Sequence, residues 1–342
     1  MTGMTKFSRR SFLVMPLAFA ACKPGDNVLE IAGGTMGTTF SVVAVDPSGK
    51  VDSTALRREI EGALAEVNRQ MSNWDAASEI ALFNARADMD KTEISAPLAQ
   101  VMKAAEAVHV ASEGRFDTTM GPLIELWGFG ASGTKSLPND AEIADAVARS
   151  GHGNTLRLGD KTLQKKQPDA QIYLSAIGKG YGADRVGQAI EAMGITDYLI
   201  EIGGDLFAAG RNPAGLPWQV GIEKPAALSG GVLDVIGVSN LGLASSGDYR
   251  NYFEEDGKRF SHIIDPATGR PITHTTASAT VLAKNAMLAD AWATAMLILG
   301  REKGAEIAEK HKIAVLFIER DAKASGLRFT TTASTQFTAL TA

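Results

Sequence analysis

Hydrophobic positions along the chain follow helical spacing in some stretches and strand spacing in others, and the two patterns are interleaved. In residues 53–71, apolar residues recur every three or four positions, which is typical of an amphipathic helix. The same reasoning predicts helices from about residue 95 to a stop signal at residue 114, and over 140–151. Residues 35–45 are instead rich in Val and Thr, which predicts a strand.

The second half of the chain begins with a predicted strand at residues 171–175, followed by a helix with three glycines in its first turns. A long apolar helix is predicted at about 285–299, and a strand at 313–319. Four further segments, which lie after Gly194 and before the long apolar helix, are predicted to be strands: YLIEI, WQVGIEK, VLDVIGVSN and RFSHII. This order is neither strict βαβ alternation nor all-β, so we expect an α+β fold with mixed or antiparallel sheets and packed helices in one domain.

Composition narrows the class of protein. The chain has 342 residues, of which 45% are hydrophobic and 21% charged, so it can bury a substantial core. The formal net charge is −5 and no long basic run occurs after the first ten residues. We therefore expect no nucleic-acid partner.

The first 21 residues have the pattern of an export signal. Lys6, Arg9 and Arg10 precede an apolar run at 12–21 that is too short to span a bilayer as a helix. The stretch SRRSFL resembles the twin-arginine signal, which exports folded proteins. We therefore expect a periplasmic protein with a signal at 1–21, a linker at 22–34 and a catalytic domain at 35–342.

Cys22 is the only cysteine of the chain and directly follows the apolar run. The sequence FAAC resembles a bacterial lipobox, which predicts lipidation of Cys22 and a lipid anchor in the membrane. The alternative is that Cys22 belongs to a discarded signal peptide. Either way, the chain has no second thiol for an intramolecular disulfide.

Several familiar catalytic motifs are absent from the sequence: Walker A, a Gly-x-Gly-x-x-Gly in a βαβ setting, Cys-x-x-Cys and His-Glu-x-x-His. Glycine-rich or polar stretches remain at the ends of predicted elements. They are GGTMGTTF (33–40), GRFDTTMGPLIELWGFG (114–130), YLSAIGKGYGAD (173–184), EIGGDLFAAG (201–210), ASSGDYRNYF (244–253) and HIIDPATGRPI (262–272).

In this order, and with the later LADAWATA, these stretches resemble the ApbE family of FAD:protein FMN transferases. The resemblance covers nearly the whole chain after the signal. It implies transfer of FMN from FAD to a Thr or Ser hydroxyl of an acceptor protein, with release of AMP and with the help of Mg²⁺. Phosphoryl transfer of this kind needs a metal, a cradle for the pyrophosphate and a base near the attacking hydroxyl.

The expected metal ligands are hard oxygens, which Mg²⁺ prefers. Asp290 and Thr294 are four residues apart on a predicted helix, so their oxygens point to the same side. The resemblance adds the main-chain carbonyl of Ala176. Some relatives have a second Asp where this chain has Ala293, which makes the expected site poorer in negative charge. Asp290 lies in an otherwise apolar run, and a buried Asp needs a partner.

The resemblance also implies a set of contacts to FAD. Met36 and Trp74 are expected to border the cofactor, with packing in the core as the alternative for both. Gly203 and Gly204 allow a close approach of backbone to ligand. The full set of expected FAD contacts is Met36, Trp74, Arg115, Phe116, Asp117, Tyr173, Lys179, Gly203, Gly204, Asp205 and Ile264.

Two of these positions depart from some relatives. Tyr173 replaces an Asp and Lys179 replaces a Glu, so Lys179 is expected to pair with a phosphate instead of a ribose hydroxyl.

His262 stands three residues before the turn Asp265–Gly269, whose Pro and Gly favour a β-turn. It could be no more than the end of a strand. The resemblance places it beside the pyrophosphate, with Ile264 against the cofactor. An imidazole can take the proton of an incoming hydroxyl near neutral pH, so His262 is the expected general base, with a neighbouring Asp as the alternative.

Two other activities stay open from the sequence. One is a metal-dependent FAD pyrophosphatase that releases FMN and AMP, and the other is a flavin-binding lipoprotein without turnover. If the transferase reading is right, the family implies acceptors among exported domains of membrane redox proteins. These include sodium-pumping quinone reductase, Rnf-type complexes and nitrous-oxide-reductase maturation factors.

Overall fold

The computed structural model describes residues 27–130, 133, 137–226, 231–321 and 328–342. The expected export signal and Cys22 lie outside the described residues. The linker expected at 22–34 is wrong from residue 27 onward, because strand β1 (Asn27–Thr35) pairs along its whole length with β2 (Thr38–Asp46). Its apolar side chains at Leu29 and Ile31 belong to the hydrophobic core, so this segment is part of the domain.

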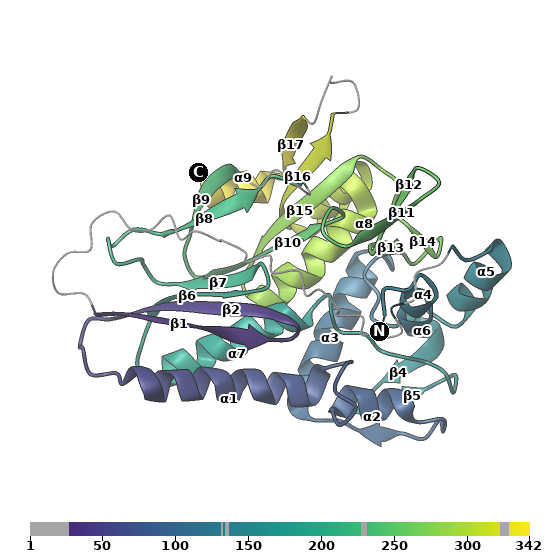
Figure 1. Ribbon diagram of the computed structural model, residues 1–342, viewed down its shortest axis with the longest axis horizontal. Coiled ribbons are helices and arrows are strands. Elements are labelled where there is room, and N and C mark those ends of the chain that lie inside the picture. Colours follow the sequence, from purple (N-terminus) through teal and green to yellow (C-terminus); the bar gives the residue numbers. More distant parts are fainter. Residues whose placement is uncertain (1–26, 131–132, 134–136, 227–230, 322–327) are drawn as a thin grey trace, which may run out of the picture.

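An antiparallel sheet of eight strands forms the centre of the described structure (Figure 1). Its order is β1-β2-β6-β7-β10-β15-β16-β17. The remaining strands of this sheet are β6 (Asp197–Ile202), β7 (Asp205–Ala209), β10 (Leu241–Gly247), β15 (Thr276–Ala283), β16 (Ala314–Arg320) and β17 (Phe329–Ala333).

Smaller antiparallel sheets surround the main sheet. They are β3 (Thr92–Glu93), β5 (Thr162–Lys165) and β4 (Leu156–Leu158); β8 (Trp218–Glu223) and β9 (Val232–Val238); β11 (Tyr252–Glu255) and β12 (Lys258–Ser261); and β13 (Ile264–Asp265) and β14 (Arg270–Pro271).

The helices of the described ranges are α1 (Ser53–Met71), α2 (Glu79–Ala85), α3 (Ala96–Ala111), α4 (Gly121–Leu126), α5 (Asp140–Ala148), α6 (His152–Thr155), α7 (Gly178–Ala192), α8 (Ala286–His311) and α9 (Thr335–Thr341). Side chains of Asp52, Ser95 and Asn285 cap the N-termini of α1, α3 and α8 by accepting backbone N–H groups. Helix α8 runs past its expected end because the chain continues helically after a break at Gly300, where φ is 68°.

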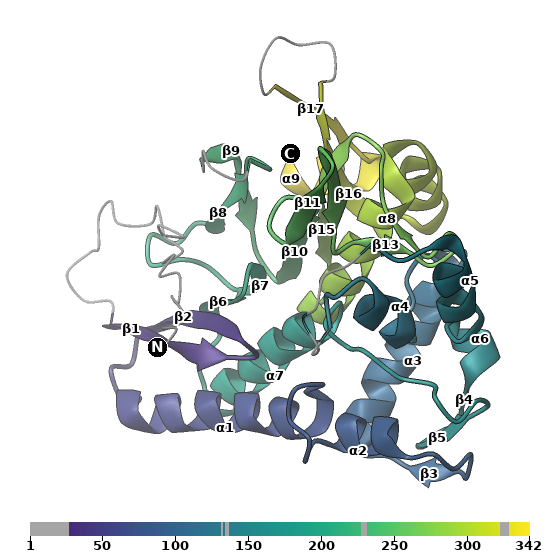
Figure 2. The ribbon, with the colours of Figure 1, turned by 45° about the vertical axis from the view of Figure 1, so that its right-hand side comes forward.

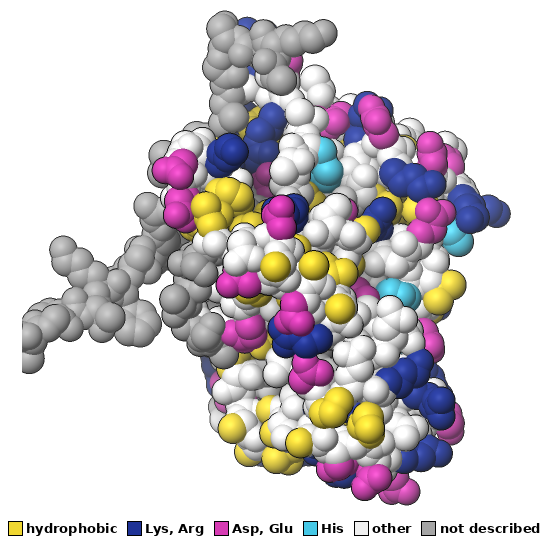
Figure 3. Space-filling model, turned by 90° about the vertical axis from the view of Figure 1, so that its right-hand side faces the viewer, with side chains coloured by type: hydrophobic (Ala, Val, Ile, Leu, Met, Phe, Trp, Pro, Cys, Tyr) yellow, Lys and Arg dark blue, Asp and Glu magenta, His cyan; other side chains and the backbone are white. Residues whose placement is uncertain are grey.

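The two faces of the main sheet are covered differently. Helices α7 and α8, with α1 and α3 beyond them, bury one face, whereas the β8–β9 pair and α9 pack on the other (Figure 2). The expected α+β class with antiparallel sheets is thereby confirmed. None of the helices in the described ranges combines the length and the apolar character that a membrane crossing requires. On the face shown in Figure 3, acidic, basic and apolar side chains are interspersed.

The strand predicted at 171–175 is wrong. This segment leads into α7, and side-chain amides bind much of its backbone in place of a neighbouring strand. Asn84 accepts the N–H of Ile172, and both Asn73 and Asn84 donate to the Ile172 carbonyl, at 2.6 and 2.9 Å. The N–H of Leu174 donates to Asn73. The apolar alternation of the segment is real, but its partners are not strands.

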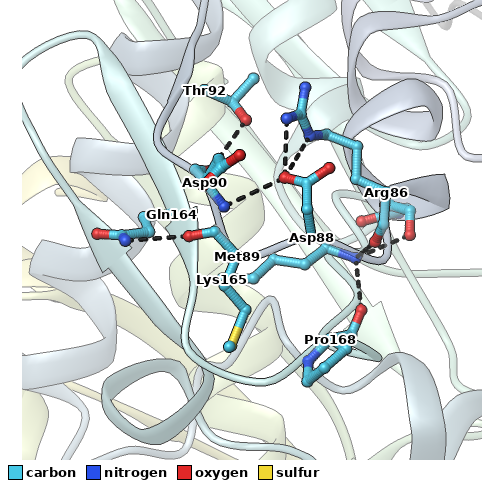
Figure 4. A network of polar contacts seen from close by, with 9 residues as sticks. Arg86, Asp88, Met89, Asp90, Thr92, Gln164, Lys165 and Pro168 are labelled. Atoms are coloured by element: carbon cyan, nitrogen blue, oxygen red, sulfur yellow. Dashed lines mark hydrogen bonds and ion pairs between the residues drawn. The ribbon is translucent and has the colours of Figure 1, made fainter.

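A buried lysine joins the loop after α2 to β5 (Figure 4). The Lys165 ammonium donates to the carbonyls of Asn84, Arg86 and Pro168, at 2.9, 2.6 and 3.1 Å. Burial lowers the pKa of Lys165, and nearby acidic residues oppose this effect. The three carbonyls give the buried ammonium the hydrogen bonds that it needs.

Candidate functional site

The starts of α7 and α8 lie against each other, and glycine makes this approach possible. A Cβ atom on Gly180 would lie 2.1 Å from the carbonyl oxygen of Ala286, closer than any side chain could come. One turn later on α7, Asp184 accepts the N–H groups of Ala286 and Met287, at 2.7 and 3.0 Å. These bonds satisfy two N–H groups at the beginning of α8 and fix that helix on α7.

Three charged side chains meet at this junction. Asp290, on the second turn of α8, is 3% exposed, and its Oδ2 accepts the N–H of Gly180 at 3.1 Å. The Nζ atom of Lys179 lies 3.6 Å from Oδ1 of Asp290 and 2.8 Å from Oδ2 of Asp205, at the start of β7. The ammonium therefore bridges two buried carboxylates.

Two acidic side chains share one ammonium in this cluster. Burial lowers the pKa of Lys179, but the Asp205 and Asp290 carboxylates outweigh it and raise the pKa above its ordinary value, so Lys179 is a cation. Burial raises the pKa of Asp205 to about 8, and the negative charge of Asp290 adds to this while Lys179 opposes it, so the Asp205 carboxyl favours its protonated form near neutral pH. A further cation beside Asp205 could take the place of that proton, because an opposite charge favours the ionised carboxylate.

The Thr294 hydroxyl and the Ala176 carbonyl are the other expected metal ligands. Thr294 lies one turn after Asp290, and its Oγ1 is 3.1 Å from Oγ of Ser246 on β10. Because the Gly180 N–H donates to Asp290, it does not continue the helical ladder to the carbonyl of Ala176, four residues earlier. The residues expected as metal ligands therefore offer a carboxylate, a hydroxyl and a carbonyl oxygen.

This donor set fits Mg²⁺, which takes a few hard oxygen ligands from protein and the rest from phosphate and water. Within the described ranges, no group of three or more His, Cys, Asp or Glu side chains is arranged to hold a metal ion. Any metal at the junction would thus depend on hydroxyl and carbonyl oxygens beside Asp290.

Two tight turns approach the cluster from the sheet. Met36 and Gly37 form the β1–β2 turn, both with positive φ, and the Cε atom of Met36 lies where a Cβ on Gly182 would come within 2.7 Å. Gly203 and Gly204 form the β6–β7 turn, also with positive φ. A Cβ on Gly203 would meet the Cδ atom of Lys179 at 3.2 Å. Gly203 and Asp205 thus lie against Lys179, with Gly204 in the same turn, and Met36 lies against Gly182, three residues further along α7.

His262 lies between β12 and β13, where one main-chain carbonyl fixes it. The carbonyl oxygen of Asn251 accepts both the backbone N–H of His262, at 3.0 Å, and a hydrogen bond from its Nδ1, at 2.9 Å. A carbonyl can only accept, so Nδ1 carries the hydrogen, and a neutral ring then has its lone pair on Nε2. The ring of Phe129 lies edge-on at 6.2 Å between centroids.

The turn after His262 is tied to neighbouring segments. Asp265 pairs with Arg115 at 2.9 Å, and the indole N–H of Trp127 donates to the Gly269 carbonyl at 2.8 Å. Ile264 is 5% exposed and packs into an apolar cluster with Trp127. Arg115 and Ile264 thus hold β13, the strand that follows His262, in place.

Three other residues expected at the cofactor, Asp117, Phe116 and Tyr173, have partners inside the protein, whereas the side chain of Trp74 is exposed. The carboxylate of Asp117 accepts from Thr119 and from the backbone N–H of His152, so it organises its own loop. Phe116 is 1% exposed and lies in the core. The Tyr173 hydroxyl donates to Glu125 at 2.5 Å, and Trp74 is 65% exposed.

Sequence reasoning missed three residues of the site. Ser246 and Asn251 lie in ASSGDYRNYF, and Asp184 ends YLSAIGKGYGAD, so each was inside a stretch that had been singled out for its glycines. The polar side chains in those stretches were the available signal. The partners of Ser246 and Asp184 could not be predicted, because these contacts join residues 48 and 102 positions apart. The partner of Asn251 is only 11 positions away, but the contact is made by its main-chain carbonyl, so the side chain gave no signal for this contact.

Comparison with known proteins places the chain in a family. The ApbE family profile matches residues 36–317. The FAD:protein FMN transferase of Haemophilus influenzae is 41% identical over 316 residues, covering 90% of this chain and 91% of that protein. The corresponding protein of Escherichia coli strain K12 is 35% identical over 345 residues, covering 97% and 96%.

Solved structures agree. The flavin transferase ApbE from Vibrio cholerae superposes with a TM-score of 0.84 at 37% identity, covering 92% of this chain and 99% of that one. The apo form of the Pseudomonas stutzeri flavinyl transferase ApbE gives a TM-score of 0.83 at 34% identity, covering 92% and 97%. The chain therefore belongs to the ApbE family.

Proposed function

We propose that the protein is an FAD:protein FMN transferase that moves FMN from FAD to a Thr or Ser hydroxyl of an acceptor protein and releases AMP. The relatives named for this activity are similar over nine-tenths of the chain or more. The observation that carries the proposal for this chain is the junction of α7, α8 and β7, where Asp290 and Asp205 meet around Lys179. Buried carboxylate oxygens of this kind can bind a metal cation, and the cation can in turn bind the pyrophosphate of FAD.

In this proposal, Asp290, Thr294 and the Ala176 carbonyl hold Mg²⁺. When bound, the ion would neutralise negative charge on the pyrophosphate as it is cleaved. Lys179 supplies a second positive charge at the same junction, and its long side chain gives it the reach to contact a phosphate oxygen. Met36, Gly203 and Gly204 line the approach from the sheet.

His262 acts as the base. The acceptor hydroxyl oxygen attacks the FMN phosphorus, the bond from that phosphorus to the bridging oxygen breaks, and AMP leaves with that oxygen. The proton of the hydroxyl passes to Nε2 of His262, which the Nδ1 bond to Asn251 leaves as the basic nitrogen of the neutral ring. Arg115, through Asp265, keeps the strand that follows His262 in place.

The other residues that this proposal places around the FAD site are Trp74, Phe116, Asp117, Tyr173 and Ile264. The exposed ring of Trp74 has area to cover a bound cofactor, whereas Ile264, Phe116 and Asp117 contribute by shaping the loops on which main-chain groups are presented.

The reaction products distinguish FMN transfer from the two alternatives, an FAD pyrophosphatase and a flavin-binding protein without turnover. Co-expression with a candidate acceptor domain should give protein-bound FMN, seen as in-gel flavin fluorescence, together with AMP. Asp290→Asn should abolish both products, while Asp160→Asn, at an exposed carboxylate, should not. Free FMN with AMP would indicate a pyrophosphatase, and intact FAD would indicate a binding protein; either result with every acceptor tried would contradict the proposal.

We further propose a periplasmic location with a lipid anchor at Cys22. The twin-arginine-like and lipobox-like stretches support it. Exported domains of membrane redox proteins, such as quinone reductase, Rnf-type or nitrous-oxide-reductase maturation components, would be the acceptors in that compartment.

A further inference from the structure

Strand β10 runs beside helix α8 at a distance set by a glycine. A Cβ on Gly242 would lie 2.4 Å from the backbone nitrogen of Ala286, so strand and helix are in direct backbone contact there. Four residues along the strand span about 13 Å at about 3.3 Å per residue. Eight residues along the helix span about 12 Å at about 1.5 Å per residue. These lengths match, and they bring Ser246 to Thr294.

Side-chain alternation puts Ser246 on the correct face. Gly242, Ala244 and Ser246 share one side of β10, and Ala244 packs in the same core cluster as the residues of α8. Leu243 belongs to the cluster on the opposite side of the sheet. Ser246 therefore brings a hydroxyl to a helix-facing row that is otherwise apolar, and its Oγ is 3.1 Å from Oγ1 of Thr294.

If Thr294 binds a metal ion, the chemistry of a hydroxyl ligand decides which of the two hydroxyls donates the hydrogen bond. A threonine oxygen binds a cation through a lone pair, so its hydrogen must point away from the cation and needs an acceptor. We propose that Ser246 is a positioning residue for the metal site, whose hydroxyl oxygen accepts the Thr294 hydrogen and turns the Thr294 lone pairs toward the cation. This inference rests on the proposed function, because it takes Thr294 as a metal ligand.

The same strand contains a natural control. Ser245 is the neighbour of Ser246, and its Oγ lies 2.8 Å from Oγ1 of Thr280 on β15. This is the same pair of residue types, on the face of the sheet turned away from α8. Ser245→Ala therefore removes a comparable hydrogen bond without touching the proposed metal site.

The test is a titration of the purified protein with Mn²⁺, followed by electron paramagnetic resonance, without FAD or acceptor. Ser246→Ala should weaken Mn²⁺ binding by about tenfold or more, as is usual when the hydrogen-bond partner of a metal ligand is removed. Ser246→Thr keeps the hydroxyl and should bind Mn²⁺ close to the wild-type level. Ser245→Ala should match the wild type, and Asp290→Asn should lose binding.

The outcomes separate this inference from the proposed function. Binding of Mn²⁺ by Asp290→Asn at the wild-type level, or none by the wild type, would contradict the metal site itself. If Asp290→Asn loses Mn²⁺ but Ser246→Ala keeps the wild-type affinity, the role of Ser246 is overturned while the site stands. Equal weakening in Ser246→Ala and Ser246→Thr, or in Ser245→Ala, would show a packing effect and would also overturn it.

Discussion

At the scale of single residues, the contact of His262 with the Asn251 carbonyl fixes which ring nitrogen carries the hydrogen. The carbonyl accepts the hydrogen of Nδ1 and holds the plane of the ring. The neutral ring therefore has its lone pair on Nε2, which is the nitrogen that takes the proton in the proposed mechanism.

Replacing His262 by Ala should slow single-turnover FMN transfer by about two to four orders of magnitude, because a general base is lost. The Met36 and Gly203–Gly204 surfaces remain, so FAD affinity should change little. FAD dissociation and single-turnover transfer are measured on the same variant, with the exposed His311→Ala as control. Weak FAD binding combined with normal transfer from bound FAD would show that His262 is only the end of a strand.

The sequence predicted Asp290 for a sound reason, since an acid in an apolar helix needs a partner. It could not identify the partners, because the Gly180 N–H and the Lys179 ammonium come from a helix more than a hundred residues earlier. Asp117 is a second case. Its family position suggests a ligand contact, and its carboxylate also accepts hydrogen bonds from Thr119, two residues away, and from the backbone N–H of His152, which lies 35 residues later and could not be predicted as a partner.

At the scale of elements, local signals predicted most helices well. The helix expected at 53–71 matches α1, and Ser95 caps α3, because spacing and capping are properties of neighbouring residues. The prediction for 22–34 failed because the glycines near the end of β1 are typical of a linker, although the segment pairs with β2. The prediction for 171–175 failed because the side chains of Asn73 and Asn84, and not a neighbouring strand, bind its backbone. Local sequence shows that a segment is extended, but not what it pairs with.

The contact between α7 and α8 can be tested at Gly180. Gly180→Ala forces a Cβ against the Ala286 carbonyl, so the helices must move apart; we expect a loss of about 1–3 kcal/mol in the free energy of unfolding, together with weaker Mn²⁺ binding. Gly62→Ala is the control, because Gly62 in α1 has open space around it and should gain up to about 1 kcal/mol. Urea unfolding of both variants checks this, and equal stability would contradict the close approach.

Asp184 should make stability depend on pH. Burial raises its pKa to about 6, against the opposing effect of the Met287 and Ala286 N–H groups. Its unfolded pKa is about 3.9, so between these values the folded protein binds more protons, and this contribution to stability falls as pH rises.

Asp184→Asn cannot titrate, so the wild type should lose stability relative to this variant by up to about 3 kcal/mol as pH rises from about 4 to about 7. Unfolding curves of both proteins across this range provide the measurement. Parallel pH dependence in the two would argue that Asp184 stays ionised throughout.

At the scale of the whole molecule, composition and element order were enough to predict an α+β domain, and the antiparallel sheet confirms it. The order of the strands in the main sheet could not be predicted from the sequence. Strands β6 and β7 lie between β2 and β10, although about 150 residues with their own helices separate β2 from β6 in the chain. Such insertions depend on the packing of distant apolar faces and not on local pattern.

The proposed export route is also a property of the whole chain. Replacing Arg9 and Arg10 together by Lys should hold the precursor in the cytoplasm, because a receptor reads the pair and not merely its charge. Fractionation of cells that express the wild type and the variant measures this, with Lys6→Arg as control. Normal secretion of the double variant would indicate another route.

The hydrogen bond between Asp290 and Gly180 joins residues 110 positions apart, and the Arg115–Asp265 pair joins residues 150 apart. Contacts between residues so far apart in the chain form late in folding, because a long loop must be ordered before they form. During synthesis, a chain that has not yet reached residue 290 has α7 but lacks the carboxylate that the Gly180 N–H meets. Cation binding at this junction would therefore begin only once nearly the whole chain has been made and folded, and fragments that end before α8 would not compete with the finished protein for the ion.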